Sequence, residues 1–312
     1  MKRYIFNITF LISFLVIFSI IVRIYYGDFE EALATELDFF PPDESLPLSE
    51  CKDWGGGVRD FHIEPGHGAK EVSVLMYHRV IDEDDLGENH FNDNDELHST
   101  IILKNTFEEQ MALLHEHNYT TLTAKELLLF LKKEIEVPKN SVVLTFDDGF
   151  KDNYVEVYPI LKNHDFHALN FIITAAITKR DPKYVANAYQ YLSTSDIQNS
   201  CDVFDFQSHT YNFHKRAFSY SPYLIVKPEE EILEDIRNSI TNLGGRNRAF
   251  AYPYGAYDEK AVSILKELDF EMAFTVIPEL AKPGIHVYEI PRIEVFETDT
   301  LKDFKRKINL IE

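Results

Sequence analysis

The chain is poor in cysteine and in basic residues. Among its 312 residues, Cys51 and Cys201 are the only cysteines, so a framework of several disulfides is excluded, and neither has a metal-binding or redox spacing. We expect both thiols to be unpaired, with a bond between them in an oxidising compartment as the alternative. The 31 Lys and Arg against 52 Asp and Glu give a net charge of −21, which argues against nucleic acid as a partner.

Long uncharged apolar runs are also scarce, and the one that stands out lies at the N-terminus. Residues 4–22 carry no charge, which is about the length that crosses a bilayer as a helix. Two basic residues precede this run and acidic residues follow it, so we expect the body of the protein outside the cytoplasm. The alternative is a cleaved signal peptide ending at Ala32-Leu33-Ala34, but that site lies far past the run. We therefore expect an uncleaved membrane anchor over residues 1–26.

Composition divides the remaining chain into two parts. Residues 27–70 contain Pro41-Pro42 and Gly55-Gly56-Gly57 without a sustained hydrophobic period, which is typical of an extracellular stalk or linker. Over residues 71–312, strand-like and helix-like segments alternate, and this order predicts βα units with a parallel sheet. About seven strands in a domain of this size predict an α/β fold, a (β/α) barrel that is incomplete relative to the eightfold one.

The individual elements follow from hydrophobic periodicity and from helix-start signals. Strands are expected at residues 72–77, 141–146, 169–174, 203–207, 249–252, 272–276 and 287–290. Capping boxes at Thr106 and Thr123 predict two helix starts. Further helices are expected at residues 152–163, 228–243, 257–268 and 300–310.

Chemically useful groups follow five of the expected strands. They are His78, the pair Asp147-Asp148, His209, Tyr254 and Arg292. Each signal alone is weak, because acidic pairs are common in this chain and a lone histidine at a strand end is more often a core or surface residue. In a βα barrel, however, the C-terminal strand ends open onto one face, which carries the active site. Their convergence on that face predicts a site.

One carboxylate and two imidazoles in this group predict a metal site. His209 and His214 lie on one short loop that can direct both rings at one ion, and Asp148 supplies the third ligand. Such a set leaves positions open for water and substrate, and it suits zinc by default, with iron, cobalt or nickel as alternatives. Asp147 lies next to a ligand, where it can take a proton from the attacking water.

Three motifs add a resemblance to a known family. Thr145–Gly149 (TFDDG), Ser208–His214 (SHTYNFH) and Phe250–Gly255 (FAYPYG) resemble, in order, the motifs of polysaccharide deacetylases with the NodB-homology domain, the fourth carbohydrate esterase family. The resemblance extends over about residues 71–300. It implies a metal-dependent hydrolase that removes N-acetyl groups from a polysaccharide.

Departures from the common pattern narrow this resemblance to a subgroup. The two histidines are five positions apart where most of the family has four, Ala251 stands where most members have arginine, and the late Leu-x-His motif is missing. The segments around His78 and Arg292 (MYHRV and IPRI) are similar to those of the biofilm poly-N-acetylglucosamine deacetylases, in which the motif order is permuted. This likeness implies His78 as general acid and Arg292 in place of the absent arginine.

The implied reaction is removal of acetyl groups from N-acetylglucosamine units of an extracellular poly-β-1,6-linked polysaccharide. Asp147 acts as the base, His78 protonates the leaving amine, and the backbone N–H of Tyr254 with the metal stabilises the oxyanion. Peptidoglycan or the linkage unit of a wall polysaccharide is the alternative substrate. A catalytically silent glycan-binding surface protein is the alternative class, against which the complete residue set argues.

Overall fold

The computed structural model describes residues 10–11, 13–19, 39–246 and 248–310 of the chain, which forms two units, Met1–Phe39 and Phe40–Glu312. In the first unit the described residues before position 20 are helical, and the rings of Phe10, Phe14 and Phe18 stack in sequence. Nowhere in these described ranges is there a helix long and apolar enough to span a membrane. The anchor expected over residues 1–26 lies largely outside them.

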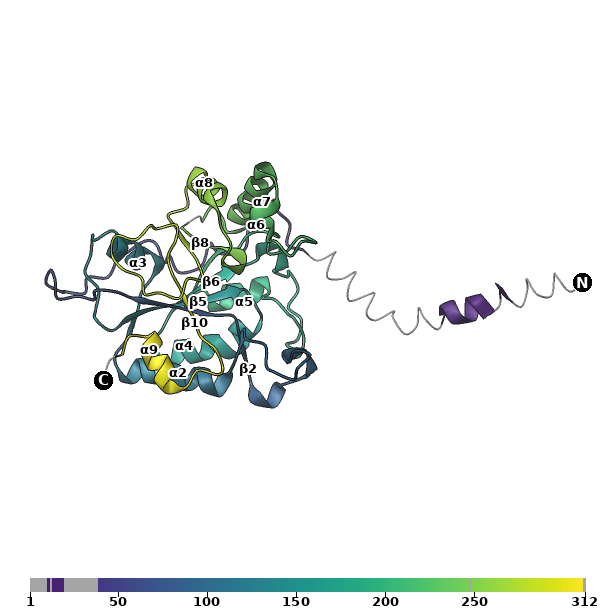
Figure 1. The fold of residues 1–312 in the computed structure, drawn as a ribbon, viewed down its shortest axis with the longest axis horizontal. Helices are drawn as coiled ribbons and strands as arrows, with labels where there is room; N and C mark the ends of the chain where they lie inside the picture. Colours follow the sequence, from purple (N-terminus) through teal and green to yellow (C-terminus); the bar gives the residue numbers. More distant parts are fainter. Residues whose placement is uncertain (1–9, 12, 20–38, 247, 311–312) are drawn as a thin grey trace, which may run out of the picture. The chain divides into compact units, whose positions relative to one another are not determined.

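A parallel sheet forms the centre of the second unit (Figure 1). The strand order is β10-β1-β5-β6-β7-β8-β9, with β4 paired to β5, and all these pairings are parallel. The strands are β1 (Ser73–Tyr77), β4 (Thr120–Thr121), β5 (Ser141–Asp148), β6 (Ala168–Ile172), β7 (Phe204–Ser208), β8 (Ala249–Ala251), β9 (Met272–Phe274) and β10 (Ile293–Glu294). A separate pair is β2 (Arg79–Ile81) with β3 (Ile101–Leu103). The incomplete parallel barrel expected from the sequence is confirmed.

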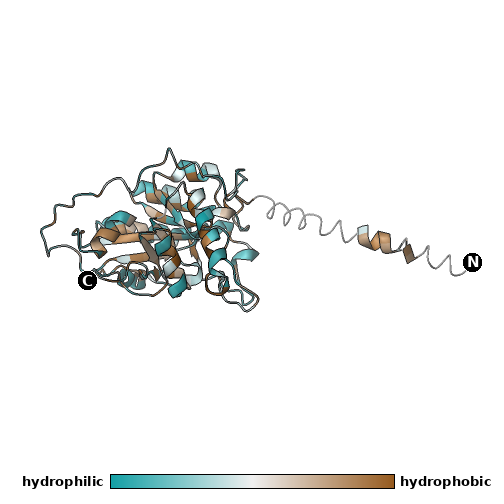
Figure 2. Cartoon of the chain, turned by 90° about the horizontal axis from the view of Figure 1, so that it is seen from above, coloured by the Kyte–Doolittle hydropathy of each residue, from teal (hydrophilic) through white to brown (hydrophobic). Residues whose placement is uncertain are grey.

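Helices cover the sheet, with α2, α4 and α9 below the strands and α6, α7 and α8 above them in Figure 1. They are α2 (Lys104–Glu116), α3 (Ala124–Leu131), α4 (Tyr158–Asn163), α5 (Thr194–Ser200), α6 (Tyr223–Val226), α7 (Glu229–Asn242), α8 (Glu259–Glu267) and α9 (Leu301–Lys307). Apolar residues gather on the central strands, whereas the helices carry hydrophilic residues as well (Figure 2). The five residues of β1 are all buried, as expected for a strand covered on both faces.

Two local expectations need correction. The capping box at Thr123 is formed, but α2 begins at Lys104, and the Thr106 hydroxyl lies inside the helix and donates to Glu297 Oε1 at 2.9 Å. The strand expected at residues 287–290 is replaced by β10 a few residues later. Pro291 has no N–H for a ladder, so regular pairing resumes only after it, although Ile290 still bridges Phe274 of β9.

Residues 40–59, here called the strap, pack on the barrel where a free linker was expected. Phe40, Leu46 and Leu48 belong to the main core, and Trp54 is buried. The indole Nε1 of Trp54 donates to the carbonyl oxygens of Cys201 and Phe204, at 3.1 and 3.2 Å. These apolar residues of the strap show no hydrophobic periodicity in the sequence, because each one packs against the folded barrel. The second compact unit begins at Phe40, so it includes most of the segment in which a linker was expected.

A disulfide between Cys51 and Cys201 joins the strap to the end of α5. The expectation of two unpaired thiols is therefore wrong. The two cysteines are 150 positions apart, and in the chain-entropy model closing so long a loop stabilises the fold by about 5 kcal/mol. The sequence could not reveal the pairing, because only the docking of the strap brings the two sulfur atoms together.

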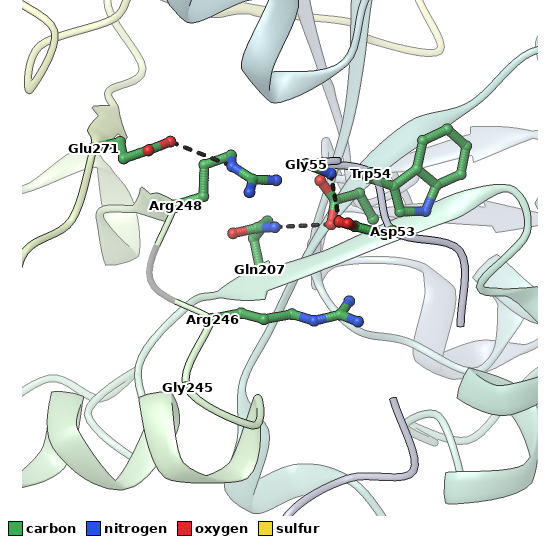
Figure 3. A pocket seen from close by; sticks show the side chains of 9 residues that line it. Asp53, Trp54, Gly55, Gln207, Gly245, Arg246, Arg248 and Glu271 are labelled. Atoms are coloured by element: carbon green, nitrogen blue, oxygen red, sulfur yellow. Dashed lines mark hydrogen bonds and ion pairs between the residues drawn. The ribbon is translucent and has the colours of Figure 1, made fainter. Parts of the chain in front are cut away.

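A pocket of about 220 Å³ lies between the strap and the N-terminal ends of β7, β8 and β9 (Figure 3). Inside it, Gln207 Nε2 donates to Asp205 Oδ1 at 2.8 Å, and Arg248 Nε lies 3.3 Å from Glu271 Oε2. Burial raises the pKa of Asp205 to about 6. The predicted site residues stand at the opposite, C-terminal ends of the strands, so this pocket is not the predicted active site.

Candidate active site

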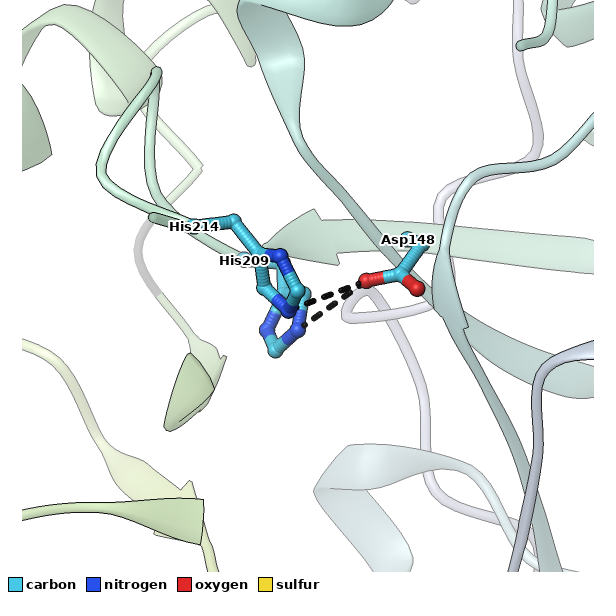
Figure 4. A group of neighbouring side chains, drawn as sticks. All are labelled: Asp148, His209 and His214. Atoms are coloured by element: carbon cyan, nitrogen blue, oxygen red, sulfur yellow. Dashed lines mark ion pairs between the residues drawn. The ribbon is translucent and has the colours of Figure 1, made fainter. Parts of the chain in front are cut away.

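The C-terminal ends of β5 and β7 bring the three predicted metal ligands together. Asp148 is the last residue of β5, and His209 directly follows β7. Asp148 points at both imidazoles in Figure 4, and its Oδ1 lies 3.5 Å from Nε2 of His209 and 3.3 Å from Nε2 of His214. One ligand atom from each residue lies within 4.8 Å of the others.

The polar atoms of this group suit a cation. Asp148 Oδ1 is buried and has no hydrogen-bond partner among the described residues. His209 Nδ1 donates to the Ala251 carbonyl oxygen at 2.8 Å, so its Nε2 lone pair is left for a ligand. An unpartnered carboxylate oxygen costs stability in a buried site, and a divalent ion that accepts all three donors removes this cost. The residues therefore fit a metal with a two-histidine, one-carboxylate set.

Burial also sets the protonation states of the three ligands. Burial lowers the pKa of His209 to about 3 and that of His214 to about 4, so both rings are neutral at ordinary pH. Neutral imidazole is the form that binds a metal. Burial likewise raises the pKa of Asp148 to about 6, with the nearby charge of Asp147 acting in the same direction. The cost of keeping this carboxylate charged is another reason for a cation beside it.

Asp147 forms a buried ion pair with Arg292. Both guanidinium NH groups donate to its carboxylate, Nη1 to Oδ1 at 2.6 Å and Nη2 to Oδ2 at 2.7 Å. The Arg292 side chain is 0% exposed and the Asp147 side chain is 4% exposed. Burial would raise the pKa of Asp147, but the charge of Arg292 outweighs it and holds this pKa well below its usual range. Arg292 therefore keeps the carboxylate ionised and fixes its plane.

Arg292 reaches Asp147 from the segment that leads into the edge strand β10. Pro291 and Arg292 precede β10, which pairs with β1 next to β5. Its Nε donates to the Thr275 carbonyl oxygen at 2.9 Å and its Nη1 to Thr145 Oγ1 at 3.2 Å. The carbonyl oxygen of Ala251 accepts the hydrogen bond from His209 Nδ1. Arg292, which the sequence analysis expected to act in place of the absent arginine, thus contacts Asp147 directly.

His78 stands at the end of β1, where its imidazole interacts electrostatically with both Asp147 and Asp148. The β1 end is held by a buried polar network. Asn153 Nδ2 donates to the His78 carbonyl oxygen at 2.8 Å, and Asp152 Oδ2 accepts from Arg79 Nε at 2.8 Å. His78 therefore enters the site on a fixed backbone.

Tyr254 packs against His214, one of the three predicted metal ligands. It has φ of 59°, in the left-handed region, and its side chain is 38% exposed. Its ring centroid lies 4.4 Å from that of His214, and the Arg216 guanidinium lies 4.1 Å from the same tyrosine ring. A strained backbone of this kind is common at functional sites. All seven residues predicted from the sequence thus lie around one site.

Sequence reasoning missed several residues that support this site. Arg216, which stacks on Tyr254, stands alone in a polar loop and gives no sequence signal. Asp152 lies directly after the TFDDG motif, and this closeness to the motif was the only feature of the sequence that could have indicated a role in the site. Asp235, on the buried side of α7, binds the loop between the two histidines, and nothing in the helix sequence marks it.

Comparisons with known proteins find a matching family and similar proteins. The family model for polysaccharide deacetylase matches residues 134–273, which include Asp147, Asp148, His209 and His214. A poly-beta-1,6-N-acetyl-D-glucosamine N-deacetylase of Staphylococcus aureus is 28% identical over 234 residues, covering 72% of this chain and 79% of that protein.

Two solved structures share the fold. IcaB from Ammonifex degensii has a TM-score of 0.62 at 24% identity, covering 78% of this chain and 97% of that one. The Streptococcus pyogenes deacetylase PplD, solved in complex with acetate, has a TM-score of 0.63 at 23% identity, covering 76% of this chain and 98% of that one. These likenesses support the parallel barrel described above.

Proposed function

Because this chain carries a polysaccharide deacetylase domain of the NodB-homology type, we propose that it removes N-acetyl groups from a poly-β-1,6-linked N-acetylglucosamine polymer outside the cell, releasing acetate. The chain is an enzyme of a carbohydrate esterase family that acts on N-acetyl amide bonds. The similarity to the staphylococcal enzyme supports the class of polymer. The observation that carries the chemistry is the Asp148, His209 and His214 donor set beside the Arg292-bound Asp147.

Asp148, His209 and His214 would hold one divalent metal, zinc by default, with iron, cobalt or nickel as alternatives. Such an ion supplies polarisation of the acetamide carbonyl and a lowered pKa for the attacking water. The Ala251 carbonyl fixes the His209 ring, so the ligand nitrogen keeps its direction during turnover.

The remaining site residues move protons and bind the reacting group. Asp147, held ionised by Arg292, accepts the proton as water adds to the acetamide carbon. The backbone N–H of Tyr254 donates to the developing oxyanion. His78 gives a proton to the nitrogen as the C–N bond breaks, because an unprotonated amine is a poor leaving group. The products are acetate and a glucosamine unit, and water has been consumed.

Acetate release by the full chain tests this proposal. Purified poly-β-1,6-N-acetylglucosamine, peptidoglycan and a wall polysaccharide are offered in turn, each with and without a chelator. We expect acetate from the first polymer, loss of release with chelator, and recovery when metal is added back. If acetate is released only from peptidoglycan, the substrate is peptidoglycan and not the poly-β-1,6-linked polymer. A metal-loaded protein that releases no acetate from any polymer yet binds one of them would be a silent glycan-binding protein.

We also propose that the chain is a single-pass protein of the cell membrane with its catalytic unit outside. The Cys51–Cys201 disulfide supports an oxidising compartment, and the uncharged run of residues 4–22 supports an anchor. The full chain is expected to stay with membranes after washing with high salt or alkali, since an apolar helix is not held by charge. Fractionation and N-terminal sequencing check this. A mature N-terminus near residue 35 would instead indicate a cleaved, secreted protein.

Replacing His78 by alanine is expected to lower kcat by roughly 100-fold or more while metal content and KM stay near the wild-type values. The reason is that His78 contributes a proton at the leaving nitrogen and is not one of the metal ligands. Steady-state kinetics with metal analysis measures this. His62→Ala, at a histidine whose side chain is 85% exposed, is the matched control and should leave turnover unchanged. Near-normal kcat in His78→Ala would remove His78 as the acid.

A further inference from the structure

The buried side of α7 carries polar residues where apolar ones are the rule. Asp235, Ser239 and Asn242 recur at helical spacing and are all buried, beside the apolar Ile232 and Ile236. A helix facing a core normally places apolar side chains at such positions. Buried polar groups are kept only where they have hydrogen-bond partners. The partners of these three side chains therefore indicate what this side of α7 does.

Asp235 binds the backbone of the loop that joins the two histidine ligands. Its Oδ1 accepts from the Tyr211 N–H at 3.0 Å, its Oδ2 accepts from the Asn212 N–H at 2.8 Å, and the Phe213 N–H also donates to this carboxylate. Three successive backbone donors thus converge on one carboxylate that is itself 4% exposed. Successive N–H groups in a turn form a concave anion site of this kind.

The neighbouring contacts hold the same loop at its start. Ser239 Oγ, one turn after Asp235, shares a hydrogen bond of 2.7 Å with Ser208 Oγ, which accepts from the Thr210 N–H at 3.3 Å. Thr210 has φ of 77°, so the chain turns sharply directly after His209. A threonine in this region is strained, and the surrounding hydrogen bonds must hold it there.

The strap contacts the same loop from another direction. The Tyr211 hydroxyl donates to the Phe40 carbonyl oxygen at 2.9 Å, and Asn242 Nδ2 donates to the carbonyl oxygens of Pro41 and Glu44, both at 2.7 Å. The polar residues of α7 therefore bind both the histidine loop and the strap. Of these contacts, only those of Asp235 reach three consecutive residues between the two ligands.

We propose that Asp235 is the positioning residue of the metal site, a role that rests on the metal site of the proposed function. Its carboxylate shapes the four-residue turn between His209 and His214, so that both Nε2 atoms face Asp148. Without the carboxylate, the two imidazoles lose their fixed separation, and the ion is bound less tightly.

Zinc affinity of the full chain tests this role, measured by competition with a chromophoric chelator. Asp235→Asn replaces one acceptor oxygen by an NH₂ group that faces backbone donors, and we expect its Kd for zinc to rise about 10–100-fold. At saturating zinc, kcat should return to within a few-fold of wild type, because the ligands, Asp147 and His78 are unchanged. Glu234→Gln, an exposed neighbour on the same helix with the same charge change, should bind zinc as the wild type does.

A loss of stability alone would not give this result. Thermal unfolding in excess chelator establishes that the variant is folded at the assay temperature, and a folded apoprotein with an intact loop binds zinc with an unchanged Kd. If Asp235→Asn does not fold, Asp235→Glu takes its place, since its longer arm shifts the loop, and weaker zinc binding is again expected. A folded variant with wild-type zinc affinity overturns the role of Asp235. Failure of the wild type itself to bind zinc would overturn the proposed metal site instead.

Discussion

Asp148→Ala is expected to abolish bound metal and deacetylation together, while the fold survives. The Asp148 carboxylate is the only charged donor of the three, and its Oδ1 is the atom that faces both imidazoles. Removing it leaves two neutral ligands, too few for a stable catalytic site. Metal content measured on the purified protein and acetate release measured on the polymer should both fall to background. His209→Ala and His214→Ala should behave in the same way.

The fold should tolerate Asp148→Ala, because the buried Oδ1 of Asp148 has no hydrogen-bond partner among the described residues. His209→Ala also removes the hydrogen bond to the Ala251 carbonyl oxygen, so it should be the less stable variant. Circular dichroism and thermal unfolding in chelator check this point. His62→Ala again serves as the control, since its side chain lies at the surface. A variant at any of the three positions that keeps full metal occupancy would exclude that residue as a ligand.

Asp147→Asn is expected to keep the metal and to lower kcat by roughly 10²–10⁴-fold, the usual loss for a general base. The amide keeps the shape of the side chain but cannot accept a proton. It also leaves the Arg292 charge buried without its partner, so the melting temperature should fall as well. Kinetics at saturating metal separate the two effects, because turnover is then measured on folded, loaded protein.

A matched control addresses the buried charge. Asp196 is a second buried carboxylate paired with a cation, and its Oδ2 lies 2.7 Å from Lys151 Nζ, outside the group of residues that would bind metal or substrate. Asp196→Asn should therefore lower stability while kcat at saturating metal changes little. If Asp147→Asn instead loses metal and its turnover follows occupancy, the roles of the two neighbouring aspartates are reversed.

Much of the barrel was predictable because its signals are local. The strand beginning at Ser141 is rich in β-branched residues and has no charge before the paired aspartates, and strands buried on both faces have this composition. The capping box at Thr123 depends on two residues three positions apart, and it forms as expected. The gathering of site residues at the C-terminal strand ends follows from parallel pairing alone.

Other features depend on partners distant in sequence. Phe40 and Trp54 gave no periodic signal, because each fills a space made by the folded barrel. The residues from Thr106 to Glu109 have the pattern of a capping box, but the Thr106 hydroxyl donates to Glu297. The helix α2 starts earlier than this local pattern predicts, at Lys104. The general lesson is that tertiary contacts override local propensity wherever they satisfy the same groups better.

The sequence by itself predicted the parallel barrel, seven residues that gather at the C-terminal ends of its strands and the kinds of chemistry that such residues can perform. Periodicity and motif order carry this information, because it depends on neighbours along the chain. Only the tertiary structure decided which groups touch: the Arg292 clamp on Asp147, the Cys51–Cys201 bond and the Asp235 contact with the histidine loop. These contacts join residues far apart in the chain, and their geometry is set by how the strands and helices pack.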